Sequence, residues 1–379
     1  MLIQFQVTNF KNFKDTLSID FSRIGGYQFN SECITNETIS KMLVYGRNAT
    51  GKTNLGEAIT DIALARFTFP RADENNFTNA DSDCEYATFE YTFKFFDDEA
   101  HYVYRKKSLG NYIAEKLTIN GTCIFDFDYE SGSFIVDNLD VISAETIIID
   151  RYLESLDQDV VVDDFLSAPP SFLRWLFANA AFSNDSVMTK MRNYIDRMAY
   201  YSVSTLNRST PLRSDAFLQS LEGEELNNLE NFLNAMGVEC QLQNKKLPDG
   251  KNEIYFKHKK PVPFFRTASS GTLVLFNLYR RIVTKIKNLS FFYLDEFDAF
   301  FHYEMSEKFL KYVKETLPHC QVILTTHNTN LMTNRIMRPD CVFILTHEGK
   351  ITALNKATTR ELREGHNLEK LYMSGEFDG

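Results

Sequence analysis

The sequence has few of the features that mark secreted, zinc-bound or membrane proteins. Its six cysteines lie far apart, without a C-x-x-C pair or histidines at zinc-finger spacing, so we expect the thiols of a reducing compartment. No uninterrupted apolar run approaches the ~20 residues that are needed to cross a bilayer. The opening MLIQFQVTNF alternates like a strand and lacks the basic start and long apolar stretch of a signal peptide. These absences favour a soluble protein of the cytoplasm.

Positive charge and coiled-coil repeats are also scarce. The net charge of −10 and the pI near 5.3 argue against a broad basic surface for nucleic acid, although they leave room for a local patch. The sequence shows no sustained apolar heptads, which excludes a long coiled-coil arm. A single tryptophan, Trp175, stands beside 33 Phe and 18 Tyr, and we expect nearly all of these aromatic side chains in the core.

Residues 46–53 read GRNATGKT, which matches the phosphate-binding pattern G-x-x-x-x-G-K-S/T. A short apolar run precedes it and apolar residues at helical spacing follow, so the pattern predicts strand, loop and helix. Backbone N–H groups of such a loop hold phosphate, Lys52 can reach the β- and γ-phosphates, and Thr53 can hold Mg²⁺. A glycine-rich surface turn is the alternative, but it leaves the strand, the Lys-Thr pair and the helix unexplained. The predicted nucleotide-binding residues are Gly46, Arg47, Asn48, Ala49, Thr50, Gly51, Lys52, Thr53 and Asn54.

The chain as a whole alternates between strand and helix patterns, which indicates an α/β fold. We expect strands before residue 45, a polar loop over 69–83, and antiparallel hairpins from Glu85. Helical patterns follow Ile147, including the stretch VMTKMRNYIDRMAYYS, and strands resume after Gly237. The simplest arrangement is one nucleotide-binding core in two halves, with a helical insertion as a lid or partner-binding region. The expected divisions are 1–149, 150–237 and 238–379.

Residues 290–302, SFFYLDEFDAFFH, predict a buried strand that ends in the adjacent carboxylates Asp295 and Glu296. Such a pair is costly to bury unless a cation meets it, and a Mg²⁺–nucleotide complex supplies one. We assign Asp295 to Mg²⁺, directly or through water, and Glu296 to polarising the water that attacks the γ-phosphate. A solvent-facing strand end is the alternative, and it is common for the dipeptide alone.

Residues 321–331, QVILTTHNTNL, predict another buried strand, followed by His327. A histidine at the carboxyl end of a parallel strand beside that of Asp295 would lie within reach of the γ-phosphate, and we count it with Glu296 and Lys52 as catalytic. A packed or surface histidine is the alternative.

A string of small residues stands just before an apolar-periodic helix: Ser269, Ser270, Gly271 and Thr272. Small residues at a helix N-terminus form an anion site, here without a lysine. The same string equally describes an ordinary Ser/Thr helix N-cap, which needs no ligand. Both interpretations stay open from the local sequence.

In this order, the four motifs resemble the ABC-type ATPase head of RecF-like, chromosome-maintenance and OLD-like proteins. The openings VTNFKNFKDTLSIDF and VYGRNATGKTNLGEAI, the segment LDEFDAFFH and the ending GHNLEKLYMSGEFDG carry the resemblance. It implies a P-loop ATPase that uses ATP and Mg²⁺ as a head-to-tail dimer or larger assembly. ATP would lie between Lys52 of one subunit and residues 269–272 of the other.

The resemblance also assigns single residues and shows two departures. Ser269 matches the signature serine, Gly271 its second glycine, Asp298 the acidic loop, and Asn48 the asparagine of the phosphate loop. Ala49 replaces a frequent glycine. No glutamine occurs between Thr53 and Gln158, where the family usually places the residue that senses Mg²⁺ and water. Either a polar residue near Asn75 and Asn76 substitutes, or that coupling is absent.

Free-standing members of this group resemble the phage-defence ATPases of PARIS, Septu and some retron systems, which implies an ATP-dependent sensor or scaffold that controls an effector such as a nuclease. About fifty residues follow His327, so we expect the effector to be a separate protein. The alternatives are a DNA-repair ATPase that clamps nucleic acid and a nucleotide-binding scaffold that barely turns over. Candidate DNA contacts are the basic clusters 105–107, 257–260, and 280–281 with Lys285 and Lys287. A solvent-exposed strand edge or helix face explains each cluster equally well.

Overall fold

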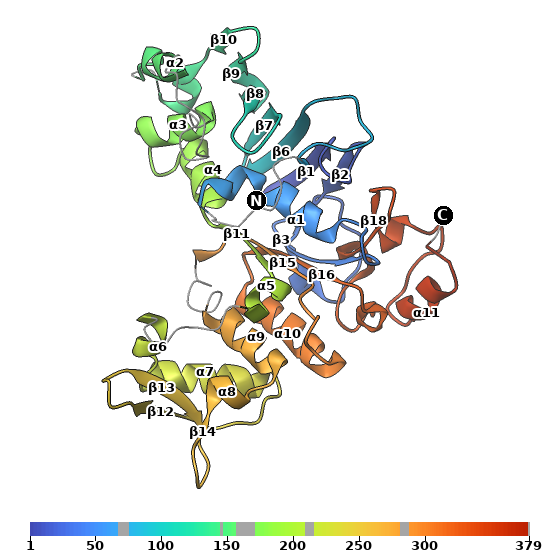
Figure 1. Cartoon of the computed structure of the whole chain (residues 1–379). Helices are drawn as coiled ribbons and strands as arrows, with labels where there is room; N and C mark the ends of the chain where they lie inside the picture. The colour runs from blue at the N-terminus through green and yellow to red at the C-terminus, as the bar shows by residue number, and fades with distance from the viewer. Residues whose placement is uncertain (67–75, 145–146, 157–170, 209–215, 281–287, 378–379) are drawn as a thin grey trace.

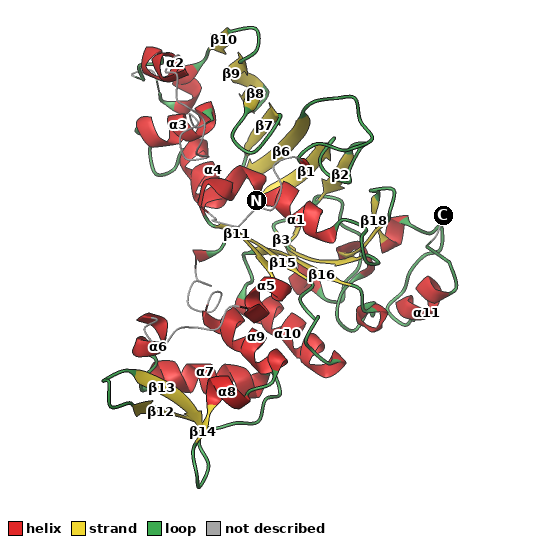
Figure 2. Cartoon of the chain, in the orientation of Figure 1, coloured by secondary structure: helices red, strands yellow, loops and turns green. Residues whose placement is uncertain are grey.

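The computed structural model of the chain describes residues 1–66, 76–144, 147–156, 171–208, 216–280 and 288–377. These residues form two large sheets and two small ones, with helices packed around them (Figures 1 and 2). Within the described ranges, no helix is both long enough and apolar enough to span a membrane.

A seven-stranded antiparallel sheet forms the upper part of the molecule in Figure 1. Its strands run in the order β10 (Ser133–Val136), β9 (Thr122–Asp128), β8 (Tyr112–Ile119), β7 (Asp98–Lys106), β6 (Ala87–Phe95), β1 (Leu2–Thr8) and β2 (Leu17–Asp20). Buried and more exposed side chains alternate along β8, as expected for a sheet with one covered face. The predicted hairpins from Glu85 on are confirmed.

A six-stranded sheet forms the centre of the molecule. Its order is β11 (Met198–Ser202), β15 (Phe291–Asp295), β16 (Gln321–Thr326), β5 (Lys41–Tyr45), β17 (Val342–Leu345) and β18 (Ile351–Ala353). The first five strands are parallel and β18 is antiparallel. Every residue of β5, β15 and β16 is buried, which explains why these strands read as continuous apolar runs rather than as alternating patterns.

Helices lie above and below this central sheet in Figure 1. The helix α1 (Lys52–Thr60) packs on β11 and β15, where Gly56 of α1 meets the rings of Tyr200 and Tyr293. On the lower side lie α5 (Val203–Arg208), α9 (Ser270–Leu278) and α10 (Tyr303–Thr316). The short α11 (Leu368–Met373) lies near the C-terminus, and β3 (Ile34–Thr35) pairs with β4 (Thr38–Ile39).

A small lobe, residues 216–267, projects from the lower end of the molecule in Figure 1. It contains α6 (Ala216–Ser220), α7 (Glu224–Ala235) and α8 (Phe264–Thr267), together with a three-stranded antiparallel sheet of β12 (Leu242–Lys246), β13 (Asn252–Phe256) and β14 (Val262–Pro263). The helix α7 contacts both β12 and α9, so the lobe is attached to the helices under the central sheet.

The region predicted as one helical insertion is divided in the structure. Its first helices, α2 (Asp150–Leu156), α3 (Phe172–Asn179) and α4 (Val187–Asp196), accompany the antiparallel sheet, and the ring of Tyr194 packs on those of Phe93 and Phe95. Of its later helices, α5 lies under the central sheet, whereas α6 and α7 belong to the small lobe. The division at residues 150 and 237 stays a prediction, and the helices between these residues pack on different parts of the structure.

The prediction that helix continues through MAYYS is also wrong, because Met198–Ser202 forms β11 at the edge of the central sheet. The ring of Tyr200 stacks on that of Tyr293 at 5.7 Å, and this tertiary contact favours the strand. The two-residue strands β3 and β4 were not predicted. Residues 69–75 of the predicted polar loop lie outside the described residues, as do Pro169, Pro170 and Pro211, where the sequence predicts breaks between helices.

Candidate nucleotide-binding site

Three neighbouring strands bring the predicted residues to one edge of the central sheet. β16 lies between β5 and β15 and is parallel to both, with Thr326 opposite Tyr45. The chain therefore leaves all three strands at the same edge, where Asp295 ends β15, His327 follows β16 and the phosphate loop follows β5. The N–H of Gly46 donates to the carbonyl of Thr326 at 3.2 Å, which joins the start of the loop to the end of β16.

The phosphate loop is held by an asparagine from the N-terminal turn. Gly51 has a φ of +98°, and a Cβ there would clash with the side chain of Asn12, so the position requires glycine. Asn12 Nδ2 donates to the carbonyl of Thr50 at 3.1 Å, and Asn12 Oδ1 accepts from Asn54 Nδ2 at 2.6 Å. Ala49 has a φ of +64°, a left-handed conformation that costs alanine about 1 kcal/mol. The replacement of a frequent glycine at that position therefore introduces strain.

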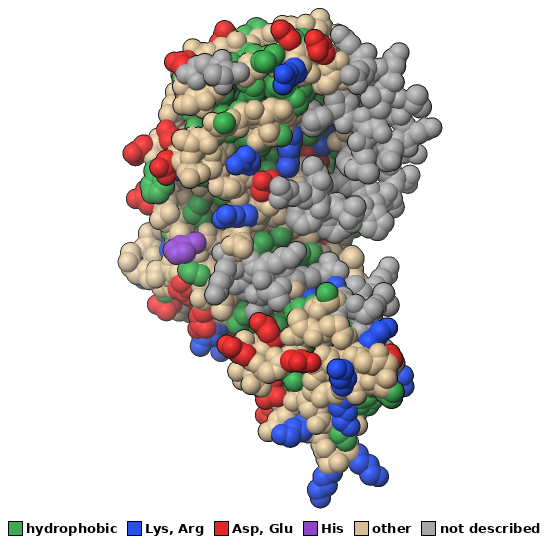
Figure 3. Space-filling model, turned by 90° about the vertical axis from the view of Figure 1, so that its left-hand side faces the viewer, with side chains coloured by type: hydrophobic (Ala, Val, Ile, Leu, Met, Phe, Trp, Pro, Cys, Tyr) green, Lys and Arg blue, Asp and Glu red, His purple; other side chains and the backbone are tan. Residues whose placement is uncertain are grey.

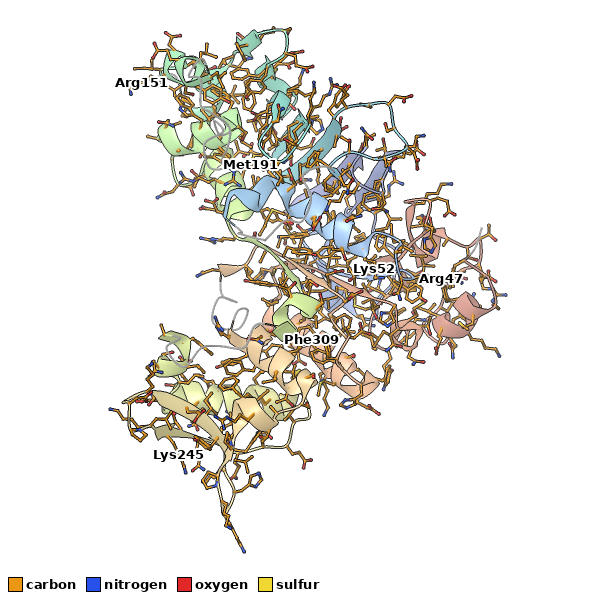
Figure 4. The ribbon with its side chains drawn as sticks, in the orientation of Figure 1. Arg47, Lys52, Arg151, Met191, Lys245 and Phe309 are labelled. Carbon is orange, nitrogen blue, oxygen red and sulfur yellow. The ribbon has the colours of Figure 1, made fainter. Side chains whose placement is uncertain are left out.

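Lys52 begins α1 and turns its ammonium group back over the loop, close to Arg47 (Figure 4). Its Nζ donates to the carbonyls of Gly46 at 2.8 Å and Arg47 at 3.1 Å. Burial lowers the pKa of Lys52, while three nearby carboxylates act in the opposite direction. The hydroxyl of Tyr293 donates to the backbone carbonyl of Lys52 at 2.5 Å, which fixes the start of the helix on β15. A buried cation thus lies within the loop, at a position that suits a phosphate group.

Asp295 is a buried carboxylate, 2% exposed, that two hydroxyl groups contact. Its Oδ2 accepts from Thr53 Oγ1 and its Oδ1 from Thr325 Oγ1, each at 2.7 Å. Burial raises the pKa of Asp295, and the two hydrogen bonds oppose that rise. Hydroxyl and carboxylate oxygens are hard ligands, so Thr53 and Asp295 fit Mg²⁺. In the described part of the chain no group of three or more His, Cys, Asp or Glu could hold a metal, so such an ion would share its coordination with phosphates and water.

The two remaining predicted catalytic residues lie next to this centre. Glu296 is half-buried and has a φ of +50°, an uncommon conformation outside glycine that is often found at functional sites. Its N–H donates to Thr325 Oγ1 at 2.8 Å, so one threonine fixes both acidic residues. His327 is exposed directly after β16. Its contact with a γ-phosphate stays a prediction.

The serine–glycine string begins α9, where Ser269 is the N-cap. Its Oγ accepts from the N–H of Thr272 at 3.2 Å, as the N-cap interpretation predicts. Ser269 and Ser270 are exposed, so the same helix N-terminus also faces solvent. In Figure 1, α9 lies well below α1, and the string is therefore separated from the phosphate loop of its own chain. The structure brings together all the predicted site residues except this string.

Sequence reasoning did not single out Asn12 or Thr325, which position the loop and the acidic pair. Asn12 stands in the opening segment that carried the family resemblance, and Thr325 ends the predicted strand before His327, so both had a weak signal. Of the candidates for the missing glutamine, Asn76 is exposed, while Asn75 lies outside the described residues.

Residues 154–333 match a protein-family model described as "AAA domain, putative AbiEii toxin, Type IV TA system". The matched segment contains the serine–glycine string, the acidic pair and His327, and the phosphate loop precedes it. In the central sheet the phosphate loop follows β5, the acidic pair stands at the end of β15, and β16 lies between these two strands. The matched segment is slightly less than half of the chain, and over it the chain is similar to this AAA family.

Solved structures similar to this chain include two of SMC proteins and one of RecF. A structure titled "Crystal structure of the SmcHead bound to the C-winged helix domain of ScpA" is 15% identical, with a TM-score of 0.46, and the match covers 93% of this chain and 97% of that one. The SMC head domain from Thermotoga maritima is 17% identical, with a TM-score of 0.43 and coverage of 93% and 98%. The recombination mediator protein RecF is 15% identical, with a TM-score of 0.41 and the same coverage. No curated protein matches the sequence.

Proposed function

We propose that the head binds ATP with Mg²⁺ and hydrolyses it, and that two copies pair head to tail so that each completes the site of the other. The observation that carries the proposal is the hydrogen-bond chain Thr53–Asp295–Thr325, each bond 2.7 Å long. It joins the phosphate loop, the acidic strand and the strand of His327 at one point. Burying the Asp295 carboxylate at this junction costs free energy unless a cation binds there.

Each residue then has a role that its position supports. Lys52 and the N–H groups of residues 46–54 draw the phosphates into the loop. A Mg²⁺ ion held by Thr53 and Asp295 would neutralise the negative charge of the transferred phosphoryl group. Glu296 polarises the attacking water, and His327 contacts the γ-phosphate from the neighbouring strand.

The second copy supplies the anion site that the loop's own chain does not bring near. Ser269 and Ser270 are exposed at the start of α9, and this helix N-terminus is far from α1 in the same chain. In a head-to-tail pair, residues 269–272 of one copy face the γ-phosphate bound by the other. Dimer formation is thereby linked to the nucleotide state, because ATP adds its binding energy to the paired form.

The output that we propose is control of a separate effector protein, such as a nuclease, in a bacterial anti-phage system. The description of the matched family, which names a toxin of a toxin–antitoxin system, supports a role of this kind. Co-purification of the chain with the products of neighbouring genes tests it. If no partner is captured and phage sensitivity is independent of Lys52, this part of the proposal is wrong.

Two substitutions separate nucleotide binding from hydrolysis. Lys52→Ala should weaken ATP binding at least about tenfold, because a charge-assisted contact with phosphate is lost. Glu296→Gln keeps the shape and should retain binding, while turnover falls by roughly 10² to 10⁴. Binding is measured by titration calorimetry with Mg²⁺–ATP, and turnover by phosphate release. If Glu296→Gln left both assembly and output unchanged, the chain would be a nucleotide-binding scaffold rather than a switch.

A further inference from the structure

The short helix α11 packs beside the segment that carries His327. It begins after Asn367, whose Oδ1 accepts from the N–H of Lys370 at 2.8 Å. Leu368 in its first turn is fully buried, and the helix contacts the single helical turn η8 (Thr329–Leu331), which follows His327 closely. In Figure 1, α11 lies on the right-hand side of the molecule, close to the C-terminus. The site described above makes no use of this helix.

The segment of His327 is held on both sides by carboxylate groups. Before it, Thr326 Oγ1 donates to Asp298 Oδ2 at 2.7 Å. After it, Thr329 Oγ1 donates to Glu369 Oε1 at 3.0 Å. Asp298 belongs to the loop after the acidic pair, whereas Glu369 belongs to α11. The backbone around an exposed histidine is thus fixed by one hydrogen bond from the catalytic side and one from α11.

The same helix also contacts the strand that leads into the phosphate loop. The ring of Tyr372 lies edge-on to that of Tyr45, the last residue of β5, with 4.9 Å between the ring centres. Burial, together with a hydrogen bond to Tyr372, raises the pKa of Tyr45 to about 12. Glu369 and Tyr372 are three residues apart and therefore lie on one face of α11. That face links the phosphate-loop strand to the segment of His327.

The chain that leads into α11 is attached to the same region. Asn334 is 4% exposed, and its Nδ2 donates to the carbonyls of Arg363 at 2.9 Å and Glu364 at 3.1 Å. The region after His327 and the approach to α11 are therefore joined twice, once at Thr329 and once at Asn334. Because of these two links, a displacement of α11 displaces η8 as well.

We propose that Glu369 and Tyr372 are positioning residues, which through α11 set the place of His327 relative to the phosphate loop. This role rests on the proposed function, in which His327 contacts the γ-phosphate. Such a contact depends strongly on placement, since a shift of about 1 Å can lower a rate by about 10²-fold. Neither side chain is assigned a contact with the nucleotide, so both act on turnover and not on the affinity for ATP.

Four substitutions test the two contacts of α11. Glu369→Ala removes the acceptor of the Thr329 hydroxyl, whereas Glu369→Gln keeps an oxygen there. Tyr372→Ala removes the ring contact with Tyr45, whereas Tyr372→Phe keeps it. Thr329→Val, alone and combined with Glu369→Ala, removes the donor of the same hydrogen bond with little change of shape.

Two further variants are controls. Glu364→Ala removes an exposed carboxylate just before α11 and leaves the backbone carbonyl of that residue in place. Lys259→Gln changes one exposed charge of the small lobe, where Lys and Arg side chains gather at the lower end of Figure 3. Both controls should behave like the wild type.

Two measurements are made on every variant. Phosphate release at increasing Mg²⁺–ATP concentration gives kcat and KM. Hydrogen exchange of the backbone N–H groups of residues 326–332, followed by mass spectrometry without nucleotide, reports local opening of the segment of His327. The exchange measurement does not depend on ATP turnover.

Glu369→Ala, Thr329→Val and Tyr372→Ala should each lower kcat at least about tenfold and leave KM within about twofold, because only the placement of His327 changes. Glu369→Gln and Tyr372→Phe should recover most of the wild-type kcat. Glu369→Ala and Thr329→Val should also speed exchange in residues 326–332, and their combination should be no worse than either alone, since both remove one hydrogen bond.

Several results would overturn the proposal: equal losses of kcat in Glu369→Ala and Glu364→Ala, unchanged exchange in Glu369→Ala, or exchange that rises over the whole chain, which would assign Glu369 to stability alone. Unchanged kcat in Tyr372→Ala would overturn the link to the phosphate loop. A wild type without ATP turnover would refute the proposed function instead. The exchange data would then still decide whether α11 holds the segment of His327.

Discussion

Gly271 is packed against the loop that follows the acidic pair. A Cβ at this position would lie 2.7 Å from the carbonyl oxygen of Phe300, closer than real side chains approach. The N-terminus of α9 and the loop after Glu296 therefore constrain each other. A change at the acidic pair can in this way reach Ser269, which the proposed dimer presents to the other copy.

Gly271→Ala should consequently lower ATP turnover and destabilise the head by roughly 1–3 kcal/mol, the usual effect of overpacking. Binding of ATP to the phosphate loop of a single chain should change little, because residues 46–54 are untouched. Gly365→Ala is the matched control, since a Cβ there meets nothing within 4 Å. Calorimetric binding, phosphate release and chemical denaturation measure the three effects. Equal ATP turnover in Gly271→Ala and Gly365→Ala would contradict the proposed effect of the contact between Gly271 and Phe300.

The grouping of Lys52, Asp295 and Glu296 at one edge of the central sheet could be predicted from the sequence, because each lies in or next to a recognisable motif. Asn12 and Thr325 act by hydrogen bonds to residues far away in the chain, at 3.1 Å and 2.7 Å. These hydrogen-bond partners are far apart in the sequence and can be identified only from the three-dimensional structure. For the same reason the sequence could not choose between the two interpretations of Ser269.

At the scale of elements, a buried carboxylate fixes the start of α3 on β8. Glu115 is 1% exposed and accepts from the hydroxyls of Tyr102 and Tyr129, each at 2.6 Å, and from the N–H of Phe172 at 2.8 Å. Burial raises the pKa of Glu115, although these hydrogen bonds favour the ionised form. The helix is therefore attached to the antiparallel sheet by a group that titrates.

The folded protein accordingly binds the Glu115 proton more tightly than the unfolded chain does. In the pH range between the unfolded and the folded pKa, the native state holds more protons, so this contribution to the free energy of unfolding falls as pH rises. The loss is on the order of 1.4 kcal/mol for each unit of pKa difference.

Comparison of the wild type with Glu115→Gln between pH 5 and 8 by urea denaturation isolates the effect. The stability of the wild type relative to the variant should decrease toward high pH. Glu99→Gln, an exposed position on the adjacent β7, controls for the loss of one carboxylate. A relative stability that increases with pH would contradict the assignment.

Long, regular elements could be predicted from the sequence, and short ones that depend on tertiary pairing could not. The buried strands β5, β15 and β16 read as apolar runs, and the hairpins of the antiparallel sheet read as alternation. The five residues of β11 directly follow α4, so only the parallel pairing with β15 distinguishes them from more helix. That strand is also what divides the predicted insertion.

At the scale of the whole molecule, the phosphate loop and the predicted signature are separated within one chain. The loop lies over the central sheet with α1, while Ser269 begins α9 on the other side, next to the small lobe (Figure 1). On the proposed function, a complete ATPase site needs a second copy, so the rate per chain should rise with protein concentration.

The most direct test mixes two inactive variants, Lys52→Ala and Ser269→Arg. In a head-to-tail pair, the intact loop of the second variant faces the intact signature of the first, so one of the two sites is complete. The mixture should recover up to roughly a quarter of wild-type turnover, because half of randomly formed dimers are mixed and each has one site. Each variant alone should stay inactive at the same total concentration. A mixture that remains inactive although the subunits exchange, or full activity of Ser269→Arg alone, would contradict a site shared between two copies.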